Sequence, residues 1–471
     1  MLLLRKLFFL AFLIVYVIVC PLLILYALGY IYNPVAQELV HTGVLNLVSI
    51  PSGADIYLGK SRFSHNTPAV IRELLGGSYK ITLKKKGYKV WTHSITIEAG
   101  KAAAFKNILL IPNNWSPENI TTHGCKDLIP IENEQLFLIT TGSDLGSFFV
   151  YNVNGNIRPL SSAQSPFSAM PVTKVYYAAK SDAIVICGGS SGDKRYLYLN
   201  LKDKKPEAID ITNLFPDTPS SITWQAEKEP DLFARQKNCI NLLKVKAEKT
   251  YPCYWDNIKG FGIYDDRVYI IDQNDILIHQ TFDTHKQKNL SEDMHLAKRL
   301  FGRSEFYLIE AGNDEIISFL GTKGDFIVNF PPYHIAAKDV IGYRFDNNPD
   351  LLLYWTKTSL SIVDFSVGRD KTVFHENFKV RTIYENGRNI KQVFWADEDS
   401  HILCNDADNI YLIELQPQGP VHVEFVGKIK NNTKVFYDNG ENALYYLDDK
   451  DGVLKRLQII SKQPITISPP G

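Results

Sequence analysis

One run in the sequence places a serine between glycines at the spacing of a hydrolase nucleophile. Residues 188–192 satisfy the pattern G-x-S-x-G, and the apolar residues 183–187 before them predict a strand. A nucleophile elbow also needs a helix after the serine, whereas residues 195–201 predict a second strand. The run therefore predicts a hairpin connection. It is no phosphate-binding loop either, since neither serine nor threonine follows Lys194.

Two clusters of side-chain oxygens have the chemistry of calcium ligands. Residues 405–409 and 448–452 are rich in Asp and Asn, but neither has the ligand spacing and terminal glutamate of a calcium loop. Because Asp and Asn also cap their own turns, we interpret both clusters as hairpin turns. His123 and Cys125 lack a second pair that would complete a zinc site. We expect no catalytic, cofactor-binding or metal-ligating residues, and no cofactor.

Four tryptophans have rings suited to stacking on sugars, as a glycan-binding surface requires. They lie within strand patterns, which favours packing in the core over ligand binding. The four are Trp224, Trp255, Trp355 and Trp395.

The composition favours a mainly β protein and argues against a nucleic-acid partner. The 471 residues include 25 Tyr and 25 Phe but only 3 Met, and this aromatic enrichment is typical of sheets. Lys plus Arg equals Asp plus Glu at 51 each, so no basic excess is available to neutralise a phosphate backbone.

The six cysteines do not form a complete disulfide framework. Cys20 lies in an apolar segment, which leaves an odd number for the rest of the chain. One or two bridges remain open on an exported side, and the pair Cys239 and Cys253 is one candidate. The others are interpreted as small buried apolar residues.

The N-terminal segment predicts a membrane anchor. Residues 7–32 carry no charge, and a helix of that length, about 39 Å, exceeds the roughly 30 Å hydrocarbon core. Arg5 and Lys6 precede it, so residues 1–6 are expected in the cytoplasm and the bulk of the chain outside the membrane. A cleaved signal peptide, with a site near residues 27–29, is the alternative. The uninterrupted length favours an uncleaved anchor.

After a linker at residues 33–43, residues 44–112 predict a small β-domain. Residues 78–84 and 91–97 alternate between apolar and polar side chains, so each predicts a strand with one buried face. The ordered series of turn and strand residues resembles a PEGA domain: Pro51-Ser52-Gly53-Ala54, Tyr57-Leu58-Gly59, Thr67-Pro68, Leu74, Gly77-Ser78-Tyr79 and Gly87-Tyr88. Ser52 replaces the glutamate of the motif. The resemblance implies a sandwich-like module that binds or spaces, and it brings no catalytic residues.

Lys84, Lys85 and Lys86 are the basic run of this domain. Beside a bilayer they would suit anionic headgroups or an acidic wall polymer. A solvated strand end that discourages edge pairing is the simpler interpretation.

After a second linker at residues 113–124, residues 125–471 show a recurring β-pattern. Strong strand segments recur about every 43 residues, which is the size of a four-stranded propeller blade. The segments are residues 148–153, 196–201, 240–245, 276–282, 326–330, 360–365, 410–415 and 453–459. They resemble degenerate blades of the WD-repeat or Tol type, without the Trp-Asp signature. We expect a propeller of seven or eight blades, with an array of β-sandwiches as the alternative.

These elements predict a bacterial cell-envelope protein that presents two β-modules outside a single-pass anchor. The expected activity is binding or scaffolding of an envelope protein or polysaccharide, with membrane contact through residues 7–32 and no enzymatic function. The alternative is a propeller-fold lyase or hydrolase that acts on envelope polysaccharide from a site in the central channel.

Overall fold

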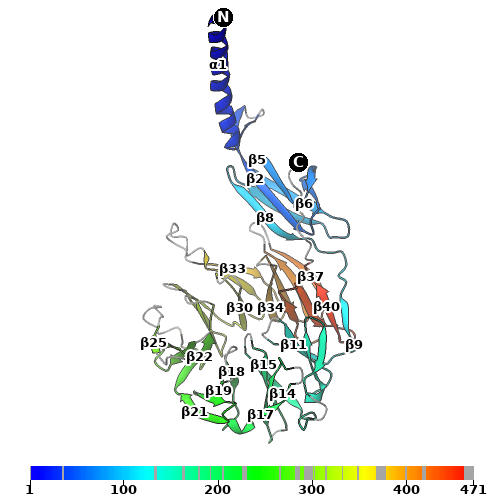
Figure 1. Ribbon diagram of the computed structural model, residues 1–471, viewed down its shortest axis with the longest axis vertical. Helices are drawn as coiled ribbons and strands as arrows, with labels where there is room; N and C mark the ends of the chain where they lie inside the picture. The colour runs from blue at the N-terminus through cyan, green and yellow to red at the C-terminus, as the bar shows by residue number, and fades with distance from the viewer. Residues whose placement is uncertain are drawn as a thin grey trace. The chain divides into compact units, whose positions relative to one another are not determined.

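The protein is described by a computed structural model. The structure describes residues 2–33, 37–131, 135–161, 165–178, 181–190, 193–203, 206–224, 231–264, 267–281, 287–290, 301, 303–312, 316–330, 333–346, 350–366, 378–397, 400–415 and 421–460. These residues form one N-terminal helix followed by β-structure (Figure 1).

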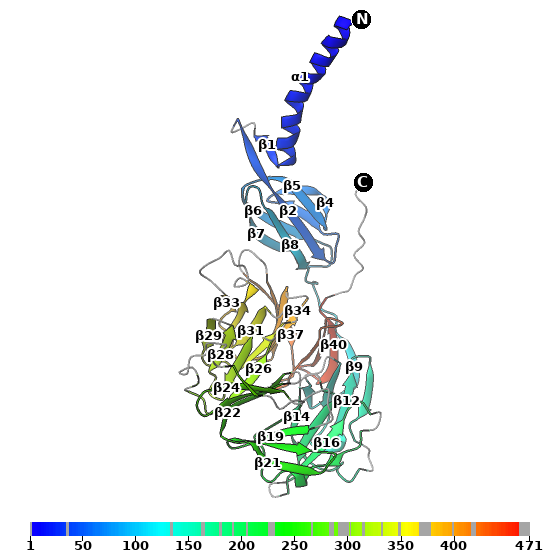
Figure 2. The ribbon, with the colours of Figure 1, turned by 60° about the vertical axis from the view of Figure 1, so that its left-hand side comes forward.

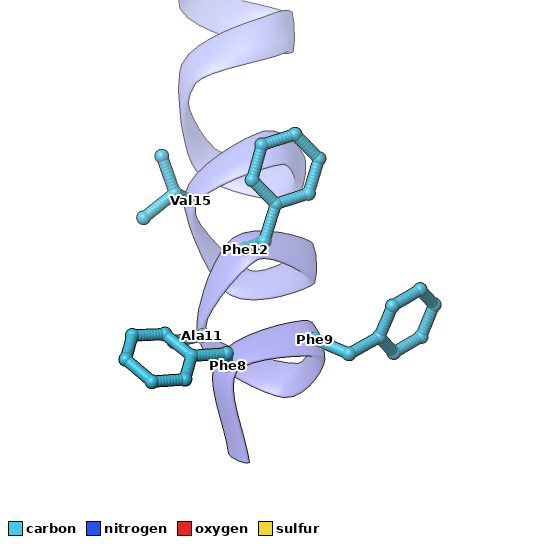
Figure 3. A pocket seen from close by; sticks show the side chains of 5 residues that line it. All are labelled: Phe8, Phe9, Ala11, Phe12 and Val15. Carbon is cyan, nitrogen blue, oxygen red and sulfur yellow. The ribbon is translucent and has the colours of Figure 1, made fainter. Parts of the chain in front are cut away.

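The N-terminal helix α1, Leu2–Ala27, exposes most of its apolar side chains from Phe8 onward. Phe8, Phe12 and Tyr26 are 70%, 72% and 61% exposed. Figure 3 shows Phe8, Phe9, Phe12 and Val15 pointing away from the helix in different directions. Among the described helices, α1 is long and apolar enough to cross a membrane, a property that anchors and signal sequences share.

The apolar segment and the first linker differ from their predicted bounds. The helix begins at Leu2 and ends at Ala27, because Gly29 adopts a positive φ of 83° and its N–H bonds back to Tyr26. The residues predicted as the end of the anchor instead form strand β1, Tyr30–Asn33, which pairs with β2, Glu38–Ile50. Most of the predicted linker is therefore a β-hairpin.

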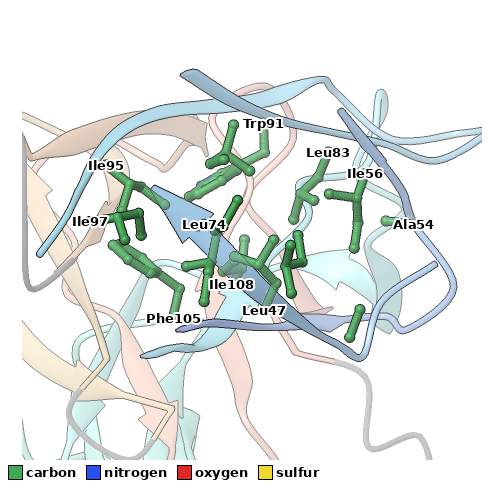
Figure 4. Close-up of a cluster of buried hydrophobic side chains, with 14 of the residues drawn as sticks. Leu47, Ala54, Ile56, Leu74, Leu83, Trp91, Ile95, Ile97, Phe105 and Ile108 are labelled. Atoms are coloured by element: carbon green, nitrogen blue, oxygen red, sulfur yellow. The ribbon is translucent and has the colours of Figure 1, made fainter. Parts of the chain in front are cut away.

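The small β-unit is a sandwich of two sheets. In one sheet β2 pairs with β1, with β5 (Ala69–Leu75) and, in parallel, with β8 (Ala102–Leu109). The other has the order β4-β3-β6-β7, formed by Ser61–Asn66, Asp55–Leu58, Gly77–Lys84 and Trp91–Ile97. Both sheets contribute to one apolar core (Figure 4). The predicted alternation is confirmed, since Ile81, Leu83, Ile95 and Ile97 are buried there.

The large β-unit consists of four-stranded antiparallel sheets that follow one another along the chain. Counting one eight-stranded sheet as two, the described strands make eight such sheets, and in seven the strand order follows the sequence. The first three comprise β10–β13 (Asp127–Pro130, Leu136–Thr140, Phe148–Asn152, Asn156–Pro159), β14–β17 (Val172–Tyr177, Ala183–Gly188, Arg195–Asn200, Ile209–Asp210) and β18–β21 (Ser221–Trp224, Asp231–Gln236, Cys239–Lys244, Lys249–Trp255).

The next four sheets continue in the same way, and the last takes its fourth strand from the start of the unit. They comprise β22–β25 (Ile258–Tyr264, Arg267–Asp272, Leu277–Thr281, Gln287–Asn289), β26–β29 (Tyr307–Ala311, Ile317–Gly321, Phe326–Phe330, Tyr333–Ala337), β30–β33 (Gly342–Phe345, Leu351–Trp355, Leu360–Asp364, Lys379–Tyr384) and β34–β37 (Ile390–Ala396, His401–Asp406, Asn409–Glu414, His422–Lys428). The last combines β38–β40 (Phe436–Asp438, Ala443–Leu447, Val453–Gln458) with β9 (Glu118–Gly124). Strand β9 occupies most of the predicted second linker.

The sheets close into a ring. Strand β9 pairs with β40, and the first and last sheets share an apolar cluster in which the Phe137 ring lies 4.8 Å from Phe436 and 5.3 Å from Tyr445. Further clusters join the first sheet to the second, and so on to the sixth. The Phe394 ring then contacts Arg344 of the sixth sheet and Tyr437 of the last. The described unit is therefore a β-propeller and not an array of sandwiches (Figure 2).

Two neighbouring sheets are fused by a parallel pairing of their first strands, β22 and β26. Gly262 of β22 makes this approach possible, because a Cβ at this position would overlap the carbonyl oxygen of Ile309 in β26. The fusion makes these two sheets one continuous eight-stranded sheet.

We expect Gly262→Ala to destabilise the protein by about 1–3 kcal/mol or more, because the added methyl group forces β22 and β26 apart. Thermal unfolding followed by circular dichroism measures the loss. Gly427→Ala in β37 is the control, since a Cβ there meets nothing within 4 Å, and its effect should stay within about 0.5 kcal/mol. Equal melting temperatures for both variants would contradict the fused pairing.

Candidate functional site

The first strands of the eight sheets surround the centre of the large unit. These inner strands are β10, β14, β18, β22, β26, β30, β34 and β38. Strand β14 contacts β18, β10 contacts β38, and β30 contacts β34. The parallel pairing of β22 with β26 shows that inner strands run in the same direction. Their first residues therefore gather on one side of the ring, which we call the start side.

Five of the inner strands carry a lysine at or near the start. The lysines are Lys126, Lys174, Lys259, Lys391 and Lys434. Two are held in partly buried ion pairs with hairpin turns of their own sheets: Lys259 Nζ lies 2.7 Å from Asp275, and Lys391 Nζ lies 2.6 Å from Asp408. Lys174 Nζ lies 4.3 Å from the centre of the Tyr176 ring. The remaining two, Lys126 and Lys434, are exposed.

Asp127 lies among the exposed lysines on the start side. Burial raises the pKa of its carboxyl group, while Lys434, Lys430 and Lys126 oppose that shift. Its Oδ1 accepts a hydrogen bond from the Leu128 N–H at 2.8 Å. Lys430 Nζ donates to the Cys125 carbonyl oxygen at 2.7 Å. The arrangement provides a charged, hydrogen-bonding surface on the start side.

The glycine–serine run lies in a hairpin, as predicted. Strand β15 ends at Gly188 and pairs in antiparallel register with β16, which begins at Arg195. A strand, and not a helix, therefore follows the run, so the elbow geometry is absent there. Ser191 and Gly192 lie outside the described residues.

The two acidic clusters serve as hairpin turns, as predicted. The Asp406 carboxylate accepts hydrogen bonds from the Arg388 and Asn389 N–H groups and from the Tyr384 hydroxyl at 2.6–3.0 Å. In the second cluster, Asp448 lies 2.8 Å from Lys455 Nζ. These contacts engage the carboxylates of Asp406 and Asp448 within the fold.

His123 and Cys125, the candidate metal ligands, belong to no ligand cluster in the described part of the chain. Among the described residues no set of three His, Cys, Asp or Glu side chains has metal-binding proximity. Cys125 is buried, and burial raises the pKa of its thiol.

A further cluster, which the sequence did not indicate, contains Ser400, His401 and Asp397. The Ser400 hydroxyl contacts both His401 Nδ1 and Asp397 at 2.8 Å, so the histidine does not stand between them as in a catalytic triad.

The tryptophans pack in the core, as predicted. Trp224, Trp355 and Trp395 are buried. Trp255 is half-buried, and its ring lies 5.6 Å from Phe233 and 5.7 Å from Phe261. None of the four therefore offers a fully open ring for a sugar.

A disulfide joins Cys239 of β20 to Cys253 of β21, with Cα atoms 4.9 Å apart. This confirms the candidate pair named from the sequence. Cys125, Cys187 and Cys404 are free and buried, and Cys20 is free in α1.

Comparison with known proteins gives a family match for the small unit. Residues 42–109 match the PEGA domain. No curated protein matches the sequence. Among solved structures, the C-terminal WD40 domain of Sif2 is 11% identical with a TM-score of 0.49, covering 73% of this chain and 99% of that domain.

Two further structures give weaker likenesses. The β-propeller domain of Cps50 (Swd1) from Myceliophteria thermophila is 8% identical with a TM-score of 0.42, covering 73% of this chain and 99% of its own. PorZ of Porphyromonas gingivalis is described as a bacterial surface component of the type-IX secretion system. It is 12% identical with a TM-score of 0.38, and the match covers 70% of this chain and 42% of that chain. At these identities, what those proteins bind says nothing about this chain.

We expect Asp127→Asn to raise the melting temperature at pH 7. Burial raises the pKa of Asp127, so the folded state binds its proton more tightly than the unfolded state does, and ionisation costs stability as pH rises. The gain should shrink below about pH 4, where the wild-type carboxyl is protonated in both states. Glu207→Gln, which removes a carboxylate from an exposed position, is the control and should leave the melting temperature at pH 7 unchanged. A gain that is equal at both pH values would contradict this view of Asp127.

We expect Cys239→Ser/Cys253→Ser to lower stability by about 3 kcal/mol, the chain-entropy value for closing a loop of this length. Melting temperatures with and without reductant measure the effect. Reductant should destabilise the wild type and leave the double variant unchanged. A wild type insensitive to reductant, with both thiols reactive from the start, would show that the bond does not form.

Proposed function

We propose that this protein is a single-pass, membrane-anchored binding or scaffolding protein of the cell envelope, with its N-terminus in the cytoplasm and its β-units outside. The observation that carries this function is the exposure of α1. Its uncharged part, Phe8–Ala27, has a mean hydropathy of 3.0 and buries no side chain against the rest of the chain. Such a surface is stable in lipid and not in water.

The length of the helix favours a retained anchor over a cleaved signal. The 26 residues of α1 extend about 39 Å, while the apolar region of a signal peptide has roughly 7–15 residues. Pro21 lies inside the helix, which spanning helices tolerate. The helix joins the small unit directly, because β1 begins three residues after Ala27.

The charges and the disulfide support export of the β-units. Arg5 and Lys6 precede the uncharged part of α1, and positive charge before a first span favours a cytoplasmic N-terminus. The Cys239–Cys253 bond requires an oxidising compartment to persist. Both observations favour the same orientation.

The β-units favour binding over catalysis. The PEGA match and the propeller provide broad, rigid surfaces, and the start side presents Lys126 and Lys434 to solvent. The polar clusters of Asp406 and Ser400 are hydrogen-bonded within the fold. We therefore assign to the large unit the recognition of an envelope protein or glycan, and to the small unit spacing and binding near the membrane.

We expect protease added to cells whose outer barrier has been removed to degrade the β-units, because they lie outside the cytoplasmic membrane. Immunoblotting with a C-terminal tag, and N-terminal sequencing of the membrane-extracted protein, give the readout. The intact protein should begin at its first residues and resist carbonate extraction. Protection of the tag, or a mature N-terminus near Tyr30, would overturn the anchored topology. A cytoplasmic marker protein that stays intact is the control for lysis.

A further inference from the structure

One sheet of the small unit has an open face that combines lysines with hydroxyl groups. In the β4-β3-β6-β7 sheet, the side chains of Ile81, Leu83 and Ile95 fill the core, and the alternate residues of β6 and β7 point outward. The strand register places Lys80 opposite Ser94 and Thr82 opposite Thr92. The two threonine hydroxyls are 3.2 Å apart. We call this surface the lysine–hydroxyl face: Lys80, Thr82, Lys84, Thr92, Ser94 and Thr96.

The lysine–hydroxyl face belongs to a strongly basic part of the chain. Residues 37–113 carry ten Lys or Arg and four Asp or Glu, although the whole chain is neutral. Asp55, which lies beside Lys84 in the neighbouring strand, is engaged by Arg62 at 2.6 Å. Lys84 Nζ lies 4.7 Å from the centre of the Tyr57 ring. Within the face as defined there is no carboxylate, so its lysines attract anions.

The strand directions place Lys84 far from the end of α1. Thr42 N–H bonds to Gly29, just after the helix, and Thr42 pairs with Leu75, just before β6 begins. Strand β6 therefore starts near α1 and runs away from it, and its eight residues extend about 25 Å to Lys84. Because the Debye length is about 10 Å at 0.1 M salt, Lys84 is too distant to interact with headgroups around the helix.

We propose that the lysine–hydroxyl face binds an extended anionic glycopolymer, one with carboxylate or phosphodiester groups along a sugar chain. Lys80 and Lys84 lie four residues apart on one strand, about 13 Å, and threonine and serine hydroxyls lie between and beside them. The lysines pair with successive anionic groups, and the hydroxyls exchange hydrogen bonds with sugar hydroxyls. The exposed sheet face gives room for a chain that lies along it. Because such a polymer lies outside the membrane, this binding depends on the function proposed above.

Binding is tested with the full chain in nanodiscs of neutral lipid, with polygalacturonate as the anionic probe and dextran as the neutral one. We expect polygalacturonate to bind at 0.1 M salt, to weaken as salt is raised, and dextran not to bind. Lys80→Ser/Lys84→Ser should weaken binding by at least about tenfold, because each lysine near an anionic surface contributes favourable electrostatic energy to the binding. Arg72→Ser/Lys106→Ser, which removes the same charge from exposed positions on the other sheet, should change it by less than about twofold.

A third variant tests the hydroxyl groups at constant charge. Thr82→Val/Thr92→Val should weaken polygalacturonate binding while leaving its salt dependence unchanged, because only hydrogen bonds are removed. Circular dichroism melting curves exclude unfolding as the cause in every variant.

Four results would overturn the glycopolymer assignment. The first is that polygalacturonate does not bind, and the second is that both charge variants lose the same affinity for it. The third is that a DNA oligomer binds as tightly as polygalacturonate. The fourth is that phosphatidylglycerol vesicles bind more tightly than polygalacturonate and that Lys80→Ser/Lys84→Ser abolishes this binding. Any of them leaves the anchored topology intact, because protease accessibility reports that separately. Conversely, a cytoplasmic location would end the envelope function even if the purified protein bound the polymer.

Discussion

The pairing of β9 with β40 is the contact on which the large unit depends. Each four-stranded sheet is too small to bury its two faces alone, and packing on two neighbours covers both of them. The first and last sheets obtain their second neighbour only from each other, through Phe137, Phe436 and Tyr445. Strand β9 fastens this junction by hydrogen bonds between residues more than 300 positions apart. Without that closure, two apolar faces would meet water.

Several carboxylates of the large unit stabilise its turns and strand starts. Each sheet needs tight turns, and the turns are built from Asp and Asn, whose side chains bond to nearby N–H groups. Asp406 stabilises the approach of residues 388 and 389, and Asp275 and Asp408 bind lysines at the starts of inner strands. These three carboxylates are thereby engaged in structural contacts. The recognition that we propose uses exposed surfaces, among them the start side and the lysine–hydroxyl face.

The recurring strands were predictable because burial on both faces gives a strong local signal. The eight segments found about every 43 residues correspond to the third strands of the eight sheets, from β12 to β40. The bounds of α1 and the linkers were wrong for a different reason. Residues 118–124 are mostly exposed and show no clear alternation, so their strand conformation depends on the distant partner β40. Tyr30–Asn33 is uncharged like the helix before it, and its pairing with β2 makes it a strand.

The sequence alone determined the elements whose signal lies within neighbouring residues. These are the apolar helix, the alternating strands of the small unit, the repeat of the large unit and the turn character of the acidic clusters. Only the tertiary structure decided which distant residues meet. It placed β9 on β40, joined β22 to β26, brought Lys126 and Lys434 beside Asp127, and aligned Lys80 with Ser94. The physical reason is that local patterns record which side chains are buried, whereas register and closure depend on contacts between segments far apart in the chain.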